Sequence, residues 1–321
     1  TNAAATSFTF AAIGDVPYGP TEELGELAQR INRAAPAFTI HVGDIKSGGS
    51  KCSDEAFATV RQLFDEFEQP LVYTPGDNEW TDCHRRSCGQ YDPLERLARL
   101  RTMFFPTEQS LGNRKLTLQS QASQPGFGKF VENRRWSVGK VSFVTLHLVG
   151  SNNNWQPELP SVSEYAGRDE ANIAWLRDSF AQAKARKDVA IVLAMQADVF
   201  RPQRHRDEPR EVRKAFRPLI SDTLLPLVQA ARLPVLLALG LLGSALSAAL
   251  TYGPAHAWDW VGSEVVLGGV LAVLAALGLC WAPARVCLVL MLILLVWQLA
   301  LHERPLRLVK RSTRTPRLRR F

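Results

Sequence analysis

Net charge is nearly absent from the first 232 residues of this chain. The 321-residue sequence carries a formal charge of +7, but residues 233–321 hold nine Lys or Arg against three Asp or Glu, which leaves only +1 for the rest. A nucleic-acid surface requires concentrated positive charge. The composition therefore gives no reason to expect a nucleic-acid partner for the first 232 residues.

Cysteine is scarce as well, and the five cysteines lack the paired Cys-x-x-Cys spacing that marks a strong zinc site. Cys52, Cys83 and Cys88 lie in polar sequence, whereas the other two lie in apolar sequence. We expect a disulfide between Cys52 and Cys83 in an oxidising compartment, because each lies a few residues beyond an apolar run that reads as a strand. One alternative is a zinc cluster formed by Cys52, Cys83, His84 and Cys88. The other is that these three cysteines are unpaired thiols.

The given sequence lacks an initial methionine and contains no evident internal repeat. It begins with the small, polar stretch TNAAATS, which is typical of a chain processed by signal-peptide removal. Together with the expected disulfide, this start predicts an extracytoplasmic domain, either periplasmic or secreted.

Apolar and amphipathic segments alternate in the first part of the chain. The patterns predict strands at 7–15, 37–43 and 70–74 and helices at 21–34 and 53–67. The N-caps that we expect for these two helices are Thr21 and Ser53. Strands that alternate with helices pair in parallel, so the fold class is α/β.

The same reading continues to position 232, where the predicted globular domain, residues 1–232, ends. We expect a helix at 93–104, antiparallel strands within 129–150 that turn at Gly139, a helix at 169–187, a strand at 188–198 and helical structure at 211–232.

Three of the apolar runs end in a glycine followed by an aspartate, at Gly14-Asp15, Gly43-Asp44 and Gly76-Asp77. Carboxyl ends of parallel strands meet at one edge of a sheet, which is where ligands bind in such folds. Carboxylates that converge there repel each other unless a cation lies among them. One such turn is an ordinary turn or helix cap, but three at equivalent strand ends predict a divalent-metal site.

The strings GDVPYG, GDIKSG and GDNEW, with FVTLHLVGSNN further on, resemble a bacterial branch of the calcineurin-like metallophosphoesterase superfamily. The resemblance covers roughly residues 7–200. It implies a β-sandwich flanked by helices, two divalent metal ions (Mn, Fe, Mg or Zn) and the hydrolysis of a small phosphoester substrate.

The resemblance also assigns roles to individual residues. It implies two ions bridged by Asp44, and the implied metal ligands are Asp15, Asp44, Asp77 and Asn78. The implied catalytic residues are Asn78 and His147, and the candidate substrate contacts are Tyr18, Asn152 and Asn153. From the residues alone, His147 is equally consistent with a hydrogen-bonded histidine on a sheet surface, and the two asparagines with a turn.

The chain also departs from the family pattern. Pro17, Asn78 and Gln196 stand where the family has histidines, and the apolar segment 232–240 is followed by Leu-Leu-Gly-Ser without a histidine. These departures remove the usual general acid and several ligands. The alternative function is therefore a catalytically inactive domain of the same fold, held at a membrane as a binding module.

Uncharged apolar runs occupy 233–252, 265–282 and 286–301, within an apolar helical segment at 233–303, and a basic tail follows at 304–321. Three membrane spans are one interpretation; the positive-inside rule then places the tail in the cytoplasm and the domain outside, anchored to the inner membrane. An out-of-frame continuation and a buried helical core are the alternatives. Substrate identity and oligomeric state stay open at this point.

Overall fold

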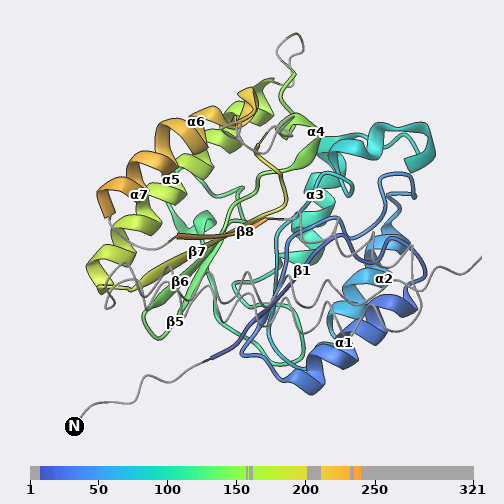
Figure 1. The fold of residues 1–321 in the computed structure, drawn as a ribbon. Helices are drawn as coiled ribbons and strands as arrows, with labels where there is room; N and C mark the ends of the chain where they lie inside the picture. The colour runs from blue at the N-terminus through green and yellow to red at the C-terminus, as the bar shows by residue number, and fades with distance from the viewer. Residues whose placement is uncertain (1–7, 157, 159–161, 201–210, 232–234, 240–321) are drawn as a thin grey trace, which may run out of the picture. The chain divides into compact units, whose positions relative to one another are not determined.

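The computed structural model describes residues 8–156, 158, 162–200, 211–231 and 235–239, all within the first of the two units of the chain. The described strands form two sheets, one of three strands in the order β1-β2-β3 and one of five in the order β4-β5-β6-β7-β8. Helices lie on both outer sides of the pair of sheets (Figure 1).

The three-stranded sheet confirms the predicted parallel pairing. Its strands are β1 (Ala11–Ile13), β2 (Thr39–His41) and β3 (Leu71–Tyr73), and both pairings are parallel. The helices between these strands are α1 (Glu22–Ala34) and α2 (Asp54–Phe64). All five elements lie within the predicted ranges, although each is shorter.

The two predicted helix caps have different outcomes. The Ser53 side chain accepts a hydrogen bond from the backbone N–H of Ala56, as expected for an N-cap. Thr21 occupies the predicted N-cap position of α1, but it has helical angles (φ −65°, ψ −20°) and its side chain makes no capping bond. An N-cap side chain reaches the helical N–H groups from an extended backbone.

The five-stranded sheet is mixed. Its strands are β4 (Gln119–Ser120), β5 (Arg134–Val138), β6 (Val141–Thr145), β7 (Ala190–Met195) and β8 (Val235–Leu239). β5 and β6 pair antiparallel across a turn at Gly139, as predicted, whereas β6-β7 and β7-β8 are parallel. The short β4 was not predicted, and β8 lies beyond position 232.

The remaining described helices cover the sheets and their ends. Helix α3 (Pro93–Phe104) matches its prediction, whereas α5 (Val162–Arg186) begins earlier than predicted. The others are η1 (Thr81–His84), η2 (Arg86–Cys88), η3 (Gln121–Ser123), α4 (Gly150–Asn153), η4 (Lys214–Phe216), α6 (Arg217–Leu219), the π-helical η5 (Ile220–Leu224) and α7 (Leu225–Ala231).

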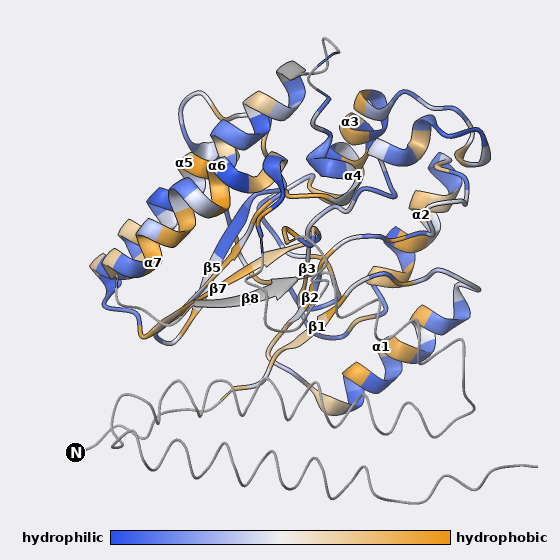
Figure 2. Cartoon of the chain, turned by 45° about the horizontal axis from the view of Figure 1, so that its top comes forward, coloured by the Kyte–Doolittle hydropathy of each residue, from blue (hydrophilic) through white to orange (hydrophobic). Residues whose placement is uncertain are grey.

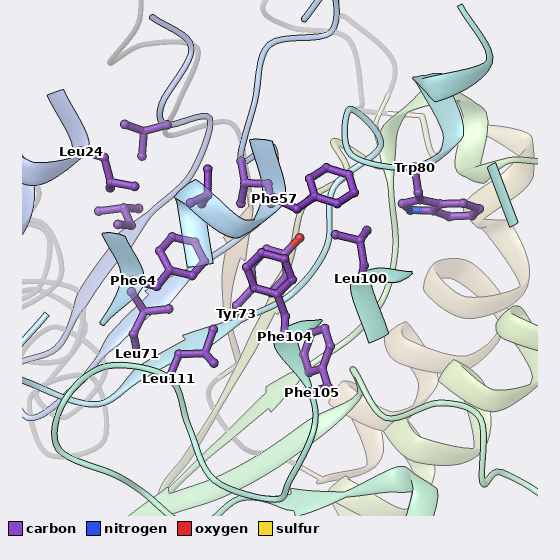
Figure 3. Packing of buried hydrophobic residues seen from close by; sticks show 14 of the residues in the cluster. Leu24, Phe57, Phe64, Leu71, Tyr73, Trp80, Leu100, Phe104, Phe105 and Leu111 are labelled. Atoms are coloured by element: carbon purple, nitrogen blue, oxygen red, sulfur yellow. The ribbon is translucent and has the colours of Figure 1, made fainter. Parts of the chain in front are cut away.

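Three buried clusters show how the layers pack. Residues of strands from both sheets, among them Ile40, Val72, Phe143 and Val192, form one cluster between the sheets. A second cluster joins the three-stranded sheet to α1, α2 and α3, and Figure 3 shows its aromatic centre around Tyr73. A third joins the five-stranded sheet to α5, α6 and η5. The described chain is therefore a β-sandwich with helices on both outer faces.

Hydropathy follows this layering. In Figure 2 strand β7 is largely hydrophobic, whereas α1 and α7 alternate hydrophobic and hydrophilic residues along their length. In α1 the buried residues are Leu24, Ala28 and Ile31, spaced by four and three positions. This spacing places one apolar face of the helix on the sheet.

The cysteine prediction is confirmed for one pair. Cys52 and Cys83 form a disulfide with Cα atoms 5.8 Å apart, and Cys88 is a buried free thiol. The alternative zinc cluster is therefore excluded, because two of its four ligands are bonded to each other.

The candidate membrane spans 265–282 and 286–301 fall outside the described residues. The first candidate, 233–252, contains strand β8 (Val235–Leu239), which pairs with β7 in the sheet, and its other residues lie outside the described part. Within the described part, no helix has both the length and the apolar character needed to cross a membrane.

Candidate metal centre

The three Gly-Asp turns meet at the carboxyl ends of β1, β2 and β3. Asp15 and Asp44 both adopt the left-handed backbone region, with φ of 55° and 56°. A Cβ at Gly76 would overlap the carboxylate of Asp44, so this close approach requires glycine. Left-handed angles cost a non-glycine residue free energy and concentrate at functional sites.

Shared donors link the three carboxylates. The Tyr18 hydroxyl lies 2.6 Å from Asp15 Oδ1 and 2.9 Å from Asp44 Oδ2. The Gln196 amide nitrogen lies 3.1 Å from Asp44 Oδ2 and 3.0 Å from Asp77 Oδ1. The structure thus brings the predicted metal ligands Asp15, Asp44 and Asp77 together, with Asp44 in the middle.

The orientation of the Gln196 amide follows from its second partner. The backbone N–H of Gly150 donates to Gln196 Oε1 at 2.6 Å. The carbonyl oxygen must accept this bond, so the amide nitrogen faces Asp44 and Asp77. Gln196 stands where the family pattern has a ligand histidine, and it presents N–H groups there instead of a lone pair.

Asn78 lies beside the carboxylates but presents donors to them. Its backbone N–H donates to Asp44 Oδ1 at 3.2 Å, and its side-chain nitrogen donates to Tyr18 Oη and to the carbonyl oxygen of Lys46. Its carbonyl oxygen points toward Gly48, where an added Cβ would lie 2.9 Å away. In this orientation Asn78 positions Asp44 and Tyr18 and offers no oxygen to a cation among the aspartates.

Glu79 is a site residue that the sequence analysis did not single out. Its Oε1 accepts hydrogen bonds from the backbone N–H groups of Asp44 (3.1 Å) and Gly76 (2.7 Å) and from the hydroxyl of Tyr73 (2.8 Å). The side chain is fully buried. Its carboxylate therefore holds the second and third turns together, and the acid in GDNEW was the available signal.

On the far side of Asp77, Ser151 joins a fifth carboxylate, that of Asp82, to the site. The Ser151 hydroxyl lies 2.8 Å from both Asp77 Oδ2 and Asp82 Oδ1. Residues 151–154 all have positive φ, between 43° and 58°, and form a left-handed turn. This turn holds Asn152, whose side chain bonds the carbonyl of Trp155, and the buried Asn153.

His147 lies in a separate buried network. Its Nδ1 is 2.8 Å from Glu132 Oε1, and its ring contacts that of Trp80. Burial lowers its pKa, although Glu132 opposes this effect. Within the described residues no hydrogen bond joins His147 to the three aspartates, and its catalytic role stays a prediction.

Negative charge accumulates at the site. Burial raises the pKa of Asp44 well above its ordinary value, and the charges of Glu79, Asp77 and Asp15 raise it further. Burial also raises the pKa of Asp15 and of Asp82, and it raises the pKa of Glu79 to about 7. Buried carboxylates that repel each other are stabilised by taking up a proton or by a bound cation.

The donor set fits a hard, oxygen-preferring divalent cation. Asp15, Asp44 and Asp77 supply carboxylate oxygens, and neutral donors stand in the two gaps between them. Among the described residues, no three His, Cys, Asp or Glu side chains are arranged closely enough to hold one metal ion as they stand. A cation in either gap therefore requires Tyr18 or Gln196 to turn aside.

No protein-family model matches the chain, and no curated protein matches it. Among solved structures, the chain is similar to GAP50, the anchor in the inner membrane complex of Plasmodium, with a TM-score of 0.41 and 13% identity over 70% of this chain and 63% of that one. It therefore spans less than two thirds of GAP50. It is also similar to a dimetal phosphatase from Danio rerio, with a TM-score of 0.39 and 12% identity over 60% and 70% of the two chains.

Proposed function

We propose that the chain is a metal-dependent phosphoester hydrolase of the calcineurin-like type. One observation carries the proposal: Asp44 Oδ2 shares a donor with Asp15 on one side and a second donor with Asp77 on the other. This pattern provides two adjacent positions that need positive charge, with Asp44 common to both. Two divalent ions would be held by Asp15, Asp44 and Asp77, with Asp44 common to both positions, and Mn, Mg, Fe or Zn are the candidates.

In this proposal the chain's own residues orient the carboxylates and the substrate. Bound divalent ions supply an activated water and charge stabilisation for the phosphoryl oxygens. Glu79 and the backbone N–H of Asn78 fix the position of Asp44. Tyr18 is 39% exposed, and its hydroxyl, once turned aside from Asp15 and Asp44, would be free to donate a hydrogen bond to a substrate oxygen.

The test is metal analysis of the purified chain together with turnover of p-nitrophenyl phosphate. We expect Mn²⁺-dependent turnover that Asp44→Asn reduces at least about 100-fold, because it removes the carboxylate common to both positions. Asp65→Asn is the matched control, since Asp65 is exposed and pairs with Arg61 on α2. Turnover that survives Asp44→Asn, or that needs no added cation, contradicts the proposal.

A second candidate is a binding module without turnover. The Gln196 amide favours it, because its N–H groups satisfy Asp44 and Asp77 without a metal ion, and Asn78 supplies no titrating proton. Gln196→His separates the two functions. An imidazole there adds a ligand for Mn or Zn, so we expect this variant to bind metal more tightly whether the chain is a hydrolase or a binding module. Turnover of p-nitrophenyl phosphate by the variant is expected only if the chain is a hydrolase.

We further propose an extracytoplasmic location, supported by the Cys52–Cys83 disulfide. Membrane attachment through the apolar segment that follows strand β8 (Val235–Leu239) is part of the same proposal. Fractionation of cells that express the full chain, followed by alkaline extraction, tests it: an anchored chain stays with the membrane pellet, whereas an unanchored chain is released.

A further inference from the structure

Arg85 is a partly exposed cation beside the acidic site, and it has no role in the proposed hydrolysis. Its Nη1 donates to Asp82 Oδ2 at 2.8 Å and to the carbonyl oxygen of Gly48 at 3.2 Å. The Arg85 side chain is 45% exposed, whereas the Asp82 side chain is 4% exposed. A buried carboxylate and a backbone carbonyl therefore anchor one corner of the guanidinium.

Two independent paths connect Arg85 to the metal-site carboxylates. On one side, Asp82 shares the Ser151 hydroxyl with Asp77. On the other side, a Cβ added at Gly48 would lie 3.2 Å from Arg85 Nη1 and 2.9 Å from Asn78 Oδ1. Both paths place the guanidinium next to residues that touch Asp77, Asp44 or Tyr18.

The anchoring leaves much of the guanidinium for a ligand. The hydrogen bonds of this side chain to the described residues all use Nη1, and the guanidinium also carries N–H groups on Nη2 and Nε. A guanidinium fixed at one corner is preorganised to bind two oxygens of a phosphate in parallel. We infer that Arg85 binds the phosphoryl oxygens of a phosphomonoester at this site.

The inference rests on the proposed function and adds a substrate class to it. A phosphomonoester carries close to two negative charges at neutral pH, whereas a diester carries one. The aspartates and Glu79 repel such a group, so a fixed cation at the rim favours the more highly charged substrate. Arg85 therefore selects monoesters over diesters.

The rival explanation is that Arg85 only neutralises Asp82. Two variants separate the explanations. Arg85→Lys keeps the charge near Asp82 but loses the planar fork. Arg86→Ala is the matched control, because Arg86 is the exposed neighbour on η2 and its side chain makes no hydrogen bond or ion pair with the described site residues.

The experiment compares full-length wild type, Arg85→Ala, Arg85→Lys and Arg86→Ala in Mn²⁺. For p-nitrophenyl phosphate we expect Arg85→Ala to raise KM about tenfold or more, with a smaller effect on kcat, because a charge-assisted bidentate contact is lost. For bis(p-nitrophenyl) phosphate we expect a change of about twofold or less. Arg85→Lys should recover only part of the loss, and Arg86→Ala should match wild type.

Calorimetric titration with inorganic phosphate gives a readout that does not require turnover. We expect the phosphate Kd of the Mn²⁺-loaded chain to rise about tenfold in Arg85→Ala. If no variant hydrolyses either ester but this difference in Kd is found, the proposed hydrolysis fails and the phosphate site stands. Equal losses for monoester and diester, an unchanged phosphate Kd, or no phosphate binding by wild type would each overturn the inference.

Discussion

At the scale of single residues, Asp44 shows how the site combines strain with rigidity. Its backbone is left-handed, its N–H is held by Glu79, and its side chain accepts from Asn78, Tyr18 and Gln196. A residue fixed at so many points cannot relax when the surrounding charge changes. The structure therefore holds unfavourable electrostatics that the proposed cations would relieve.

His41 provides a prediction on pH. The ring is fully buried on β2, bonds the Val16 carbonyl oxygen through Nε2 and accepts from the Gly43 N–H. Burial lowers its pKa from 6.5 to about 4, although the bond to Val16 opposes this. The imidazole therefore charges in the unfolded chain before it charges in the folded one. The contribution of neutral His41 to the free energy of unfolding is therefore complete above pH 6.5. It is lost as the pH falls toward 4, by up to about 3 kcal/mol.

The measurement is urea unfolding of wild type and His41→Gln at several pH values between 7 and 4, with a chelator present. Glutamine keeps an N–H donor for Val16 but has no proton to gain. We expect the wild type to lose up to about 3 kcal/mol more than the variant on acidification. Parallel loss in both proteins would show that His41 does not contribute to the acid sensitivity.

At the scale of elements, the turn that contains α4 positions Asp77 from outside the first sheet. A Cβ at Gly150 would lie 2.6–2.8 Å from the carboxylate atoms of Asp77. We expect Gly150→Ala to displace Asp77 and to weaken Mn²⁺ binding by about 10- to 100-fold, the range seen when ligand-orienting contacts are lost.

Gly49→Ala is the control for this variant, because a Cβ at Gly49 meets no atom within 4 Å. Calorimetric titration with Mn²⁺ should give wild-type affinity for Gly49→Ala and reduced affinity for Gly150→Ala. Equal affinities in the two variants would mean that contact between Gly150 and Asp77 does not set the cation site.

The disulfide joins two further elements near the site. Cys52 precedes the N-cap of α2, Cys83 lies in η1, and the two are 31 residues apart. Opening a loop of this length lowers the free energy of unfolding by about 3–4 kcal/mol in the chain-entropy description. We expect this loss in the Cys52→Ala, Cys83→Ala double variant by urea unfolding. Cys88→Ala leaves the disulfide intact and removes a weak thiol hydrogen bond to the Gly48 carbonyl oxygen, so it should lose clearly less. Similar losses would contradict the prediction.

At the scale of the whole molecule, local patterns predicted most elements because their causes are local. The Pro93–Phe104 helix starts with a proline after Asp92, and the β5-β6 hairpin turns at a glycine with positive φ. Strand β4 was missed because two residues show no periodicity. The convergence of three Gly-Asp turns follows from parallel pairing alone, which is why their meeting could be foreseen.

The contacts that define the site chemistry could not be foreseen in the same way. Gln196 meets Asp44 across 152 positions, and Ser151 meets Asp77 across 74. Such pairs depend on how the two sheets are stacked, which no local pattern records. Glu79 sits inside a recognisable motif, but its bond to the N–H of Asp44 depends on the close approach that Gly76 allows.

Cation binding should stabilise the whole domain, because Asp15, Asp44 and Asp77 follow three different strands that separate on unfolding. A ligand at 100 times its Kd adds about 2.7 kcal/mol to the free energy of unfolding. For a domain of this size that corresponds to a rise in Tm of about 5–10 °C. Thermal unfolding of the full chain in Mn²⁺ and in chelator measures the shift. Asp44→Asn should show almost none and Asp65→Asn the full shift. An equal shift in Asp44→Asn would place the stabilising cation elsewhere in the chain.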